Sequence, residues 1–226
     1  MKIWNFVTGA FQVNTFVVHL KDKHVFIVDP GGDILSISQF LASQELIPVA
    51  IVCTHGHFDH IFGIKDLRDI YANLPIVAHV DEQCYFGEDA LEAHGYDLQM
   101  MGLPQLTEAL TGIPSPDCLV EEGDSLAKLS GIPCPEAADQ WKIIHTPGHS
   151  NGSICLYNQQ EGMLFSGDTL FYGGYGHSDL YSGNQQLLFA SLRRVMKELP
   201  QDTKIYPGHR EFGVPLKDAI QGPYKK

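Results

Sequence analysis

The chain has 226 residues, of which 44% are hydrophobic and 19% charged, and a formal net charge of −12. This length and composition are typical of one globular α/β domain, because two separate domains would each have a small core. The acidic excess would repel a phosphate backbone, so nucleic acid is not expected as a partner. No uninterrupted apolar segment is long enough to cross a bilayer, so no membrane partner is expected.

The cysteines are odd in number and widely scattered, and no Cys-x-x-Cys occurs. They are Cys53, Cys84, Cys118, Cys134 and Cys155. This pattern fits neither a disulfide framework nor a thiolate zinc site, and it is typical of a reducing compartment. The amino terminus runs directly into strand-like sequence without a small-residue cleavage site. The chain is therefore predicted to be cytoplasmic, and its oligomeric state is left open.

The first part of the chain is predicted to hold strands and then helices. Three β-rich runs form an antiparallel opening, at residues 3–7, 15–20 and 25–28. Apolar residues recur at helical spacing between residues 33 and 46, with Asp33 available as the N-cap. The apolar run 49–53 predicts a buried strand, residues 61–71 a second amphipathic helix, and residues 75–78 a short strand.

The second part repeats this order. Strands are predicted at residues 118–120, 141–145, 153–157 and 163–166, a helix at 187–199, and a last strand at 204–206. Strands followed by helices, twice over, predict a four-layer αβ/βα sandwich, in which two mixed sheets pack face to face with helices outside. Residues 1–226 are expected to form one such domain. Residues 80–117, interrupted by glycine and proline, predict an insert of loops and short helices that covers the site.

Metal-binding residue types cluster where the buried strand 49–53 ends. The run from Thr54 to His60 reads Thr-His-Gly-His-Phe-Asp-His. In open α/β sheets, sites form at the carboxyl ends of strands. Three more such residues, His149, Asp168 and His209, each follow a predicted strand and a glycine, which lets the backbone turn sharply. We expect all of these side chains to project toward one edge of the sheets.

Seven imidazole and carboxylate groups exceed what one tetrahedral ion needs, so the sequence predicts two metal ions. Such donors, without thiolate, suit zinc, with iron and manganese as alternatives. By their spacing His55 and His57 face one ion, whereas Asp59 and His60 turn toward the other. Asp168 is the candidate bridge, because a carboxylate has two oxygens. A hydroxide shared by two cations becomes available near neutral pH.

The other six histidines are interpreted as hydrogen-bonded structural or surface residues. They are His19, His24, His79, His94, His145 and His177. Asp29, Thr54 and Thr146 are candidates to orient the metal ligands without binding the metal themselves. Asp29 has the alternative role of fixing the Pro30-Gly31-Gly32 turn.

These motifs together resemble the metallo-β-lactamase superfamily, specifically its single-domain branch similar to glyoxalase II (hydroxyacylglutathione hydrolase). The resemblance runs from Val28-Asp29-Pro30-Gly31-Gly32 through the histidine cluster to Tyr206-Pro207-Gly208-His209. It implies the αβ/βα sandwich. It also implies a ligand set in which metal one takes His55, His57 and His149, metal two takes Asp59, His60 and His209, and Asp168 bridges them. Metallo-β-lactamases resemble this pattern but usually lack the bridging aspartate, so lactam hydrolysis is not expected.

Three departures bear on the substrate. Where glyoxalase II-like enzymes usually carry a basic Arg or Lys after the bridging aspartate, this chain has His177, near Tyr175, and both are candidate substrate contacts. Glu211 stands where the family has a tyrosine, and the C-terminal helical domain that supplies glutathione contacts is not expected. The resemblance therefore implies the metal chemistry more firmly than it implies glutathione recognition.

The function expected from this resemblance is thioester hydrolysis, with S-lactoylglutathione or a related small-molecule thioester as substrate. The nucleophile would be the metal-bridging hydroxide, with Asp59 and Asp168 as the catalytic carboxylates. One alternative is a persulfide dioxygenase-like enzyme, which would use one iron at His55, His149 and Asp168. A further alternative is a non-hydrolytic diiron redox domain.

Overall fold

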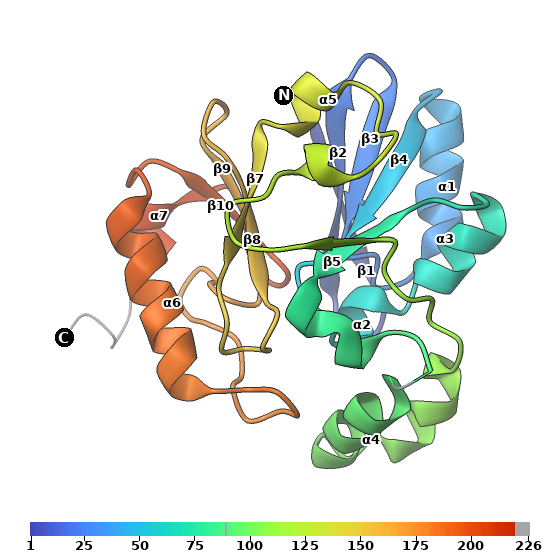
Figure 1. The fold of residues 1–226 in the computed structure, drawn as a ribbon, viewed down its shortest axis with the longest axis vertical. Helices are drawn as coiled ribbons and strands as arrows, with labels where there is room; N and C mark the ends of the chain where they lie inside the picture. The colour runs from blue at the N-terminus through green and yellow to red at the C-terminus, as the bar shows by residue number, and fades with distance from the viewer. Residues whose placement is uncertain (89, 220–226) are drawn as a thin grey trace.

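Two β-sheets, one from each part of the chain, face each other in the computed structural model (Figure 1). The structure describes residues 1–88 and 90–219, so residues 89 and 220–226 of the segment predicted to form the domain lie outside this description. The first sheet has the order β1-β2-β3-β4-β5-β6. Its strands are β1 (Ile3–Thr8), β2 (Val13–Lys21), β3 (His24–Val28), β4 (Ile47–Val52), β5 (Ile76–His79) and β6 (Cys118–Val120).

The second sheet has the order β11-β10-β9-β8-β7. Its strands are β7 (Trp141–His145), β8 (Ile154–Asn158), β9 (Met163–Gly167), β10 (Lys204–Pro207) and β11 (Val214–Pro215). Both sheets are mixed: β1, β2 and β3 pair antiparallel whereas β3 to β6 run parallel, and β9 pairs parallel with β10 beside antiparallel neighbours. The predicted α/β sandwich of two mixed sheets is confirmed.

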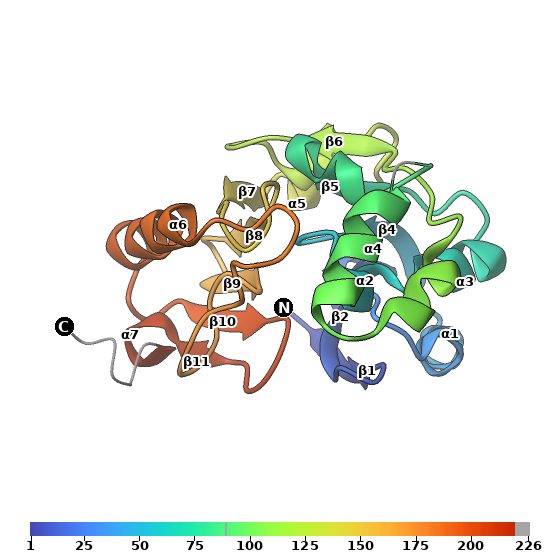
Figure 2. The same ribbon diagram turned by 90° about the horizontal axis from the view of Figure 1, so that it is seen from below.

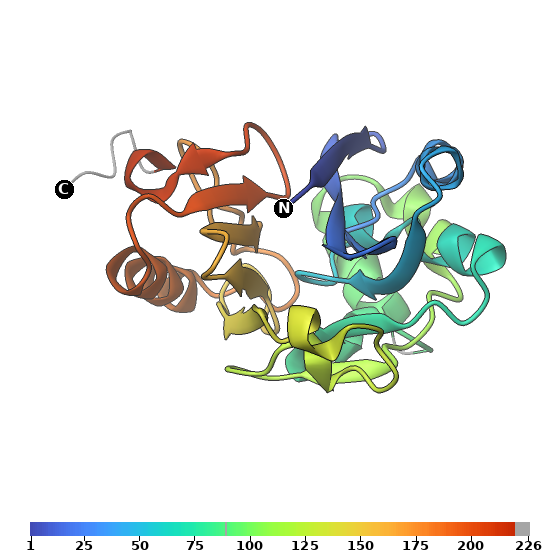
Figure 3. The same cartoon turned by 90° about the horizontal axis from the view of Figure 1, so that it is seen from above.

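Helices cover the two outer faces. In the view from above, the blue and cyan helices α1 (Ile34–Ser43) and α3 (Ile64–Ile70) lie outside the first sheet, and the orange α6 (Gln185–Glu198) lies outside the second (Figure 3). Their buried residues recur at helical spacing, as Leu188, Leu192 and Val195 do in α6. The Asn184 side chain caps α6 by accepting from the N–H groups of Gln186 and Leu187. The short helix α7 (Leu216–Ala219) follows β11.

Aromatic side chains fill the space between the sheets. Phe16 from the first sheet meets Phe165 from the second with 5.1 Å between ring centroids, and Phe26 meets Trp141 at 5.2 Å. All four rings are buried. Burial of side chains of this size contributes about 1.5–3 kcal/mol each, so this layer holds the two sheets together.

The segment 80–117 contains helices that lie at one end of the sandwich. They are η1 (Val80–Tyr85), α4 (Ala90–Met100) and η2 (Pro104–Leu110). Seen from below, α4 lies over the short helix α2 (Phe58–Ile61), and Figure 1 places both at the same end (Figure 2). The small helices η3 (Leu126–Lys128) and α5 (Pro135–Ala138) follow β6. No described helix is long and apolar enough to span a bilayer.

Two local details differ from expectation. Asp33 stands before α1, but its side chain does not cap that helix; instead it accepts the Gly9 N–H at 2.9 Å, because Asp33 adopts a left-handed backbone with φ 53°. The helix expected over residues 61–71 is present as α3, but it begins only at Ile64, since Phe62 and Gly63 separate it from α2. The break falls at Gly63, whose N–H donates to Pro30 O. A side chain at Gly63 would clash with Ile34.

Gly167 lets the second sheet approach the end of β4. A Cβ at this position would lie 2.4 Å from Thr54 Oγ1, and its φ is +47°. Gly162 has a similar φ of +61° but open space around it. The two glycines therefore separate the effect of backbone strain from that of close packing.

We expect Gly167→Ala to lower the free energy of unfolding by about 2–4 kcal/mol, because overpacking adds to the strain of a positive φ. Gly162→Ala, which carries the strain alone, should cost only about 1 kcal/mol. Urea unfolding of both variants in chelator measures the difference. Equal losses for the two variants would show that the contact with Thr54 is unimportant.

Candidate metal centre

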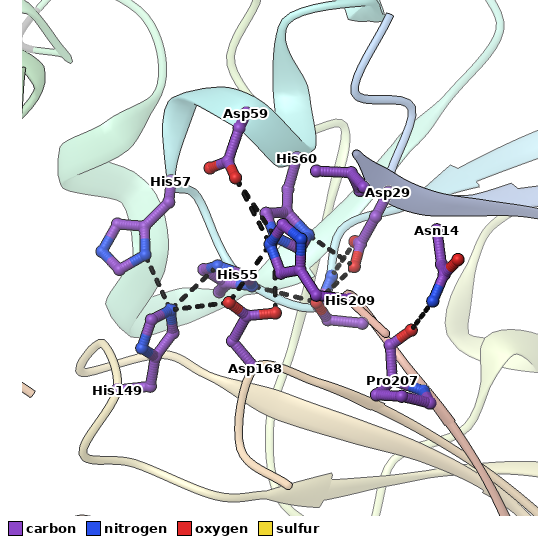
Figure 4. A network of polar contacts seen from close by, with 12 residues as sticks. Asn14, Asp29, His55, His57, Asp59, His60, His149, Asp168, Pro207 and His209 are labelled. Carbon is purple, nitrogen blue, oxygen red and sulfur yellow. Dashed lines mark hydrogen bonds and ion pairs between the residues drawn. The ribbon is translucent and has the colours of Figure 1, made fainter. Parts of the chain in front are cut away.

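The seven predicted ligands come together at one end of the two sheets (Figure 4). His55 and His57 lie in the loop after β4, and Asp59 and His60 lie in the helix α2 that follows this loop. The remaining three, His149, Asp168 and His209, follow β7, β9 and β10. Carboxyl strand ends from both sheets therefore supply the site, as the sequence predicted.

His55, His57 and His149 form the first donor set. Nδ1 of His57 lies 2.8 Å from Nε2 of His149, and that atom lies 3.1 Å from Nε2 of His55. All three rings are buried. Donors bound to one tetrahedral ion at about 2.0–2.1 Å stand roughly 3.3 Å apart, so this spacing matches a common ion.

Asp59, His60 and His209 form the second donor set. Nε2 of His209 lies 3.2 Å from Nε2 of His60 and 3.4 Å from Oδ2 of Asp59. Asp168 lies between the two sets. Its Oδ1 is 3.4 Å from His60 Nε2, and its Oδ2 is 3.7 Å from His149 Nε2. One carboxylate thus reaches both sets, which is the geometry of a bridge.

The hydrogen-bond partners of two histidines leave two ring nitrogens facing each other inside the site. His149 Nδ1 lies 2.6 Å from the carbonyl oxygen of His177, which can only accept, so Nδ1 carries the proton and Nε2 presents its lone pair. Thr54 Oγ1 donates to Asp29 at 2.6 Å and therefore accepts from His55 Nδ1 at 3.0 Å. The Nε2 atoms of His55 and His149 are then two lone pairs facing each other at 3.1 Å. A metal ion between the two atoms satisfies both lone pairs, whereas two neutral imidazoles cannot pair them by a hydrogen bond.

Asp29 supports the ligands from behind. Its Oδ1 accepts the Thr54 N–H at 2.7 Å, and its Oδ2, which accepts the Thr54 hydroxyl, also lies 3.0 Å from His60 Nδ1. Asp29 is buried and is 1% exposed. Asp29 therefore orients His60 directly and orients His55 through Thr54. These contacts give it a role at the site besides that of fixing the turn that follows it.

The two donor sets differ in charge. Burial and the neighbouring imidazoles hold the pKa of His55 well below its usual range, and burial also lowers the pKa of His57 and His149. Burial disfavours the charged form of His60 too, but Asp168, Asp59 and Asp29 outweigh it and raise the pKa of His60 to about 10. The histidines of the first set are therefore neutral near pH 7. In the second set His60 is protonated, and its positive charge takes the place of a metal ion.

We expect an ion at the second set to displace that proton. Its apparent affinity should therefore fall about tenfold for each pH unit between about pH 9 and 7, with one proton released, because His60 must lose its charge to bind. The first set should release none in this range. Calorimetric titrations in buffers of different ionisation enthalpy count the protons, and heats that are independent of the buffer for both ions would contradict this assignment.

Glu82, which the sequence analysis missed, joins the loops that carry the ligands. Its Oε1 accepts the Gly56 N–H and its Oε2 accepts the Gly152 N–H, both at 2.7 Å. The side chain is fully buried, and burial raises the pKa of Glu82 to about 7 despite these donors. Gly56 lies between two ligands of the first sheet, and Gly152 follows His149 of the second. One carboxylate thus sets the spacing between the two loops.

Thr146 and Tyr175 make other contacts than those expected of them, whereas His177 lies where a substrate contact was expected. The Thr146 hydroxyl pairs with Thr169 Oγ1 at 2.8 Å and holds strand ends together. Tyr175 packs its ring on Phe189 at 5.3 Å. The His177 side chain is 85% exposed at the rim of the cavity above the ligands, so it remains available to a substrate.

Two of the histidines interpreted as structural form a stacked pair. The rings of His79 and His145 lie 3.9 Å apart and are nearly parallel at 16°. His79 Nδ1 accepts the Asp81 N–H, and His145 Nε2 faces Asn151 O at 2.8 Å. Because one nitrogen of each ring is engaged by a backbone group, these contacts agree with the structural interpretation.

A cavity of about 440 Å³ opens onto both donor sets. Its walls combine apolar side chains with two basic ones at the mouth. The residues concerned are Phe11, Phe58, Met101, Leu180, His177 and Arg210. The Arg210 guanidinium lies 5.3 Å over the ring of Phe171. A smaller apolar cavity of about 270 Å³ adjoins it and shares Phe11 and Phe58.

An αβ/βα sandwich whose sheet ends hold two His and Asp donor sets with a shared aspartate defines a candidate binuclear metalloenzyme. A family model of the metallo-beta-lactamase superfamily matches residues 8–209. Over 224 residues the chain is 31% identical to the probable metallo-hydrolase YqgX of Bacillus subtilis, covering 99% of this chain and 97% of that protein. Over 215 residues it is 28% identical to the hydroxyacylglutathione hydrolase GloC of Haemophilus influenzae, covering 95% and 93%.

Solved structures give the same result. The chain is similar to the BLEG-1 B3 metallo-beta-lactamase with a TM-score of 0.79 and 31% identity, over 96% of this chain and 95% of that one. It is similar to TTHA1623 in a di-iron-bound form with a TM-score of 0.78 and 28% identity, over 96% and 98%. The chain belongs to the metallo-β-lactamase superfamily, and it is a metallo-hydrolase of that superfamily.

Proposed function

We propose that this protein is a thioesterase that uses two divalent metal ions to hydrolyse S-lactoylglutathione or a related thioester. The observation that carries the proposal is the position of Asp168 between two convergent donor sets at the base of the cavity. The similarity to GloC, a hydroxyacylglutathione hydrolase, supports the substrate class. Zinc is the proposed metal, with iron or manganese as alternatives that the same donors accept.

Two bound ions would supply a nucleophilic hydroxide near neutral pH and polarise the scissile carbonyl. The chain holds them through the donor sets, and Asp59, at the cavity wall, is placed to orient the attacking water. None of the described residues that line this cavity is serine, threonine, cysteine or lysine. This composition supports attack by water rather than by a side chain. Phe11 and Phe58 offer an apolar surface for the acyl group.

The second donor set is what a two-metal hydrolase requires, and the one-iron alternative leaves it unused. A persulfide dioxygenase-like site would need only His55, His149 and Asp168. Here His60 and His209 converge as closely as the first set does, with 3.2 Å between their Nε2 atoms. A second ion therefore has its ligands in place.

Asp168→Ala should remove bound metal and thioester hydrolysis together, with a loss of turnover of at least about a hundredfold, because the variant lacks the shared ligand. Asp69→Ala, which removes an exposed carboxylate from α3, is the matched control and should change neither. Elemental analysis and turnover of S-lactoylglutathione measure the two effects. Full turnover by Asp168→Ala would refute the mechanism.

The wild-type protein should also be tested on a substrate panel. It should contain S-lactoylglutathione, a thioester without glutathione, a cephalosporin, and glutathione persulfide with oxygen uptake recorded. Rapid hydrolysis of a thioester supports the proposal. Lactam hydrolysis alone would favour the activity named for BLEG-1, and oxygen uptake alone would favour the dioxygenase.

Arg210 is the residue proposed to bind a substrate carboxylate at the mouth of the cavity. Arg210→Ala should lower the preference for a carboxylate-bearing thioester over a neutral one by about tenfold, because a charge-assisted contact is lost. The preference is the ratio of the two kcat/KM values. Arg193→Ala, which removes an exposed arginine of α6, should leave the ratio unchanged. An equal loss on both substrates would exclude this role for Arg210.

A further inference from the structure

Each of three site histidines has an oxygen at the ring nitrogen that points away from the donor sets. His55 Nδ1 faces Thr54 Oγ1 at 3.0 Å, and His60 Nδ1 faces Asp29 Oδ2 at 3.0 Å. His149 Nδ1 faces the carbonyl oxygen of His177 at 2.6 Å. Such acceptors keep the proton on the outer nitrogen and leave the inner nitrogen free to bind metal.

His57 is oriented the other way round. Its Nδ1 points into the first donor set, toward His149 Nε2 at 2.8 Å, so Nε2 is the outer nitrogen (Figure 4). That nitrogen is buried, and it has no hydrogen-bond partner among the described residues. The side chain therefore lacks the oxygen that the other three histidines have.

Asp97 of α4 supplies an oxygen in that direction. Its Oδ2 lies 3.7 Å from His57 Nε2 and is also buried without a hydrogen-bond partner in the described part of the chain. Its Oδ1 is fixed, because it accepts the Tyr181 N–H at 2.7 Å. Asp97 is 1% exposed and His57 is 4% exposed, so the two unpaired atoms face each other in the buried wall of the cavity. A buried donor and acceptor left unpaired would each carry a desolvation cost of about 1–3 kcal/mol.

We propose that Asp97 is a positioning residue of the metal centre: it accepts the Nε2–H of His57 and thereby keeps Nδ1 as the metal-binding atom. A shift of less than 1 Å along the 3.7 Å separation would close this hydrogen bond. The inference rests on the proposed metal centre and adds the segment 80–117 to it. The insert thus supplies the hydrogen-bond acceptor of His57 and also lines the cavity.

Asp97 also ties the insert to the second sheet. Tyr181 lies in the loop between β9 and α6, which carries His177 and Leu180 at the cavity. The carboxylate therefore contacts a first-sheet ligand through one oxygen and a second-sheet loop through the other. A purely structural role would depend on the contacts of Asp97 with Tyr181 and Tyr85 and not on His57, and this difference makes the two roles separable.

Asp97→Asn and Asp97→Ala separate these roles. The asparagine oxygen can keep the Tyr181 N–H, while its amide nitrogen turns a donor toward His57 Nε2 and favours the wrong tautomer. Alanine removes both contacts. If Asp97 positions His57, asparagine should harm metal binding at least as much as alanine does; if it only holds the loop, alanine should be much the worse. Asp69→Asn on α3 is the matched control.

The measurements are the affinity of each ion, by competition of zinc with a chromophoric chelator, and the nitrogen chemical shifts of the histidine rings in metal-free protein. We expect both Asp97 variants to bind one of two zinc ions about 10–100-fold more weakly, and Asp97→Asn to shift His57 toward the Nδ1–H tautomer. Unfolding of the metal-free proteins shows that the variants fold.

Native affinity for both ions in either variant would overturn the proposal, as would a large loss for alanine with none for asparagine and an unchanged tautomer. Failure of the metal centre itself gives a different result, because the wild-type protein would then bind no pair of zinc ions. If zinc binds as expected but no thioester is hydrolysed, the proposed activity fails while the role of Asp97 is still decided.

Discussion

The metal centre depends on one buried carboxylate, Glu82, which accepts N–H groups from two loops that belong to different sheets. Seven donors can converge only if the end of β4 and the end of β7 are held at a fixed separation. Gly56 and Gly152 allow this, because a Cβ on either would lie within 2.6 Å of the helix η1 that carries Glu82. The aromatic layer between the sheets holds the two sheets together, whereas the Glu82 contact fixes how far apart the two ligand-bearing loops lie.

The positions of the ligands could be predicted because the relevant patterns are local. A strongly apolar strand, a glycine and a metal-binding side chain recur in the chain, and strand ends lie together at the edge of a sheet. His149, Asp168 and His209 were therefore assigned to one site from sequence, and in the structure Asp168 lies within 3.7 Å of His149 and 3.5 Å of His209. Helical spacing likewise located α1 and α6, although α1 ends at Ser43 rather than near residue 46.

The supporting residues could not be predicted, because their roles depend on contacts between distant segments. Glu82 and Asp97 lie in the part of the chain with the weakest periodicity, and nothing local distinguishes a buried acid from a solvated one. The position of Arg210 near the site could have been predicted, since Arg210 directly follows His209. The break at Gly63 arises because Pro30 and Ile34 pack against it, a tertiary effect that overrides the helical pattern.

Asn14 on β2 has a consequence for the order in which the protein matures. Its side chain donates to Pro207 O and Arg210 O, and its N–H donates to Gly208 O, so an early strand holds the turn that presents His209 (Figure 4). During synthesis the first sheet can form, and His55 and His57 can emerge, long before that turn exists. The second donor set is complete only after His209, the last of the seven donors in sequence, has been synthesised. An ion that uses this set can therefore be bound only after the two sheets have closed.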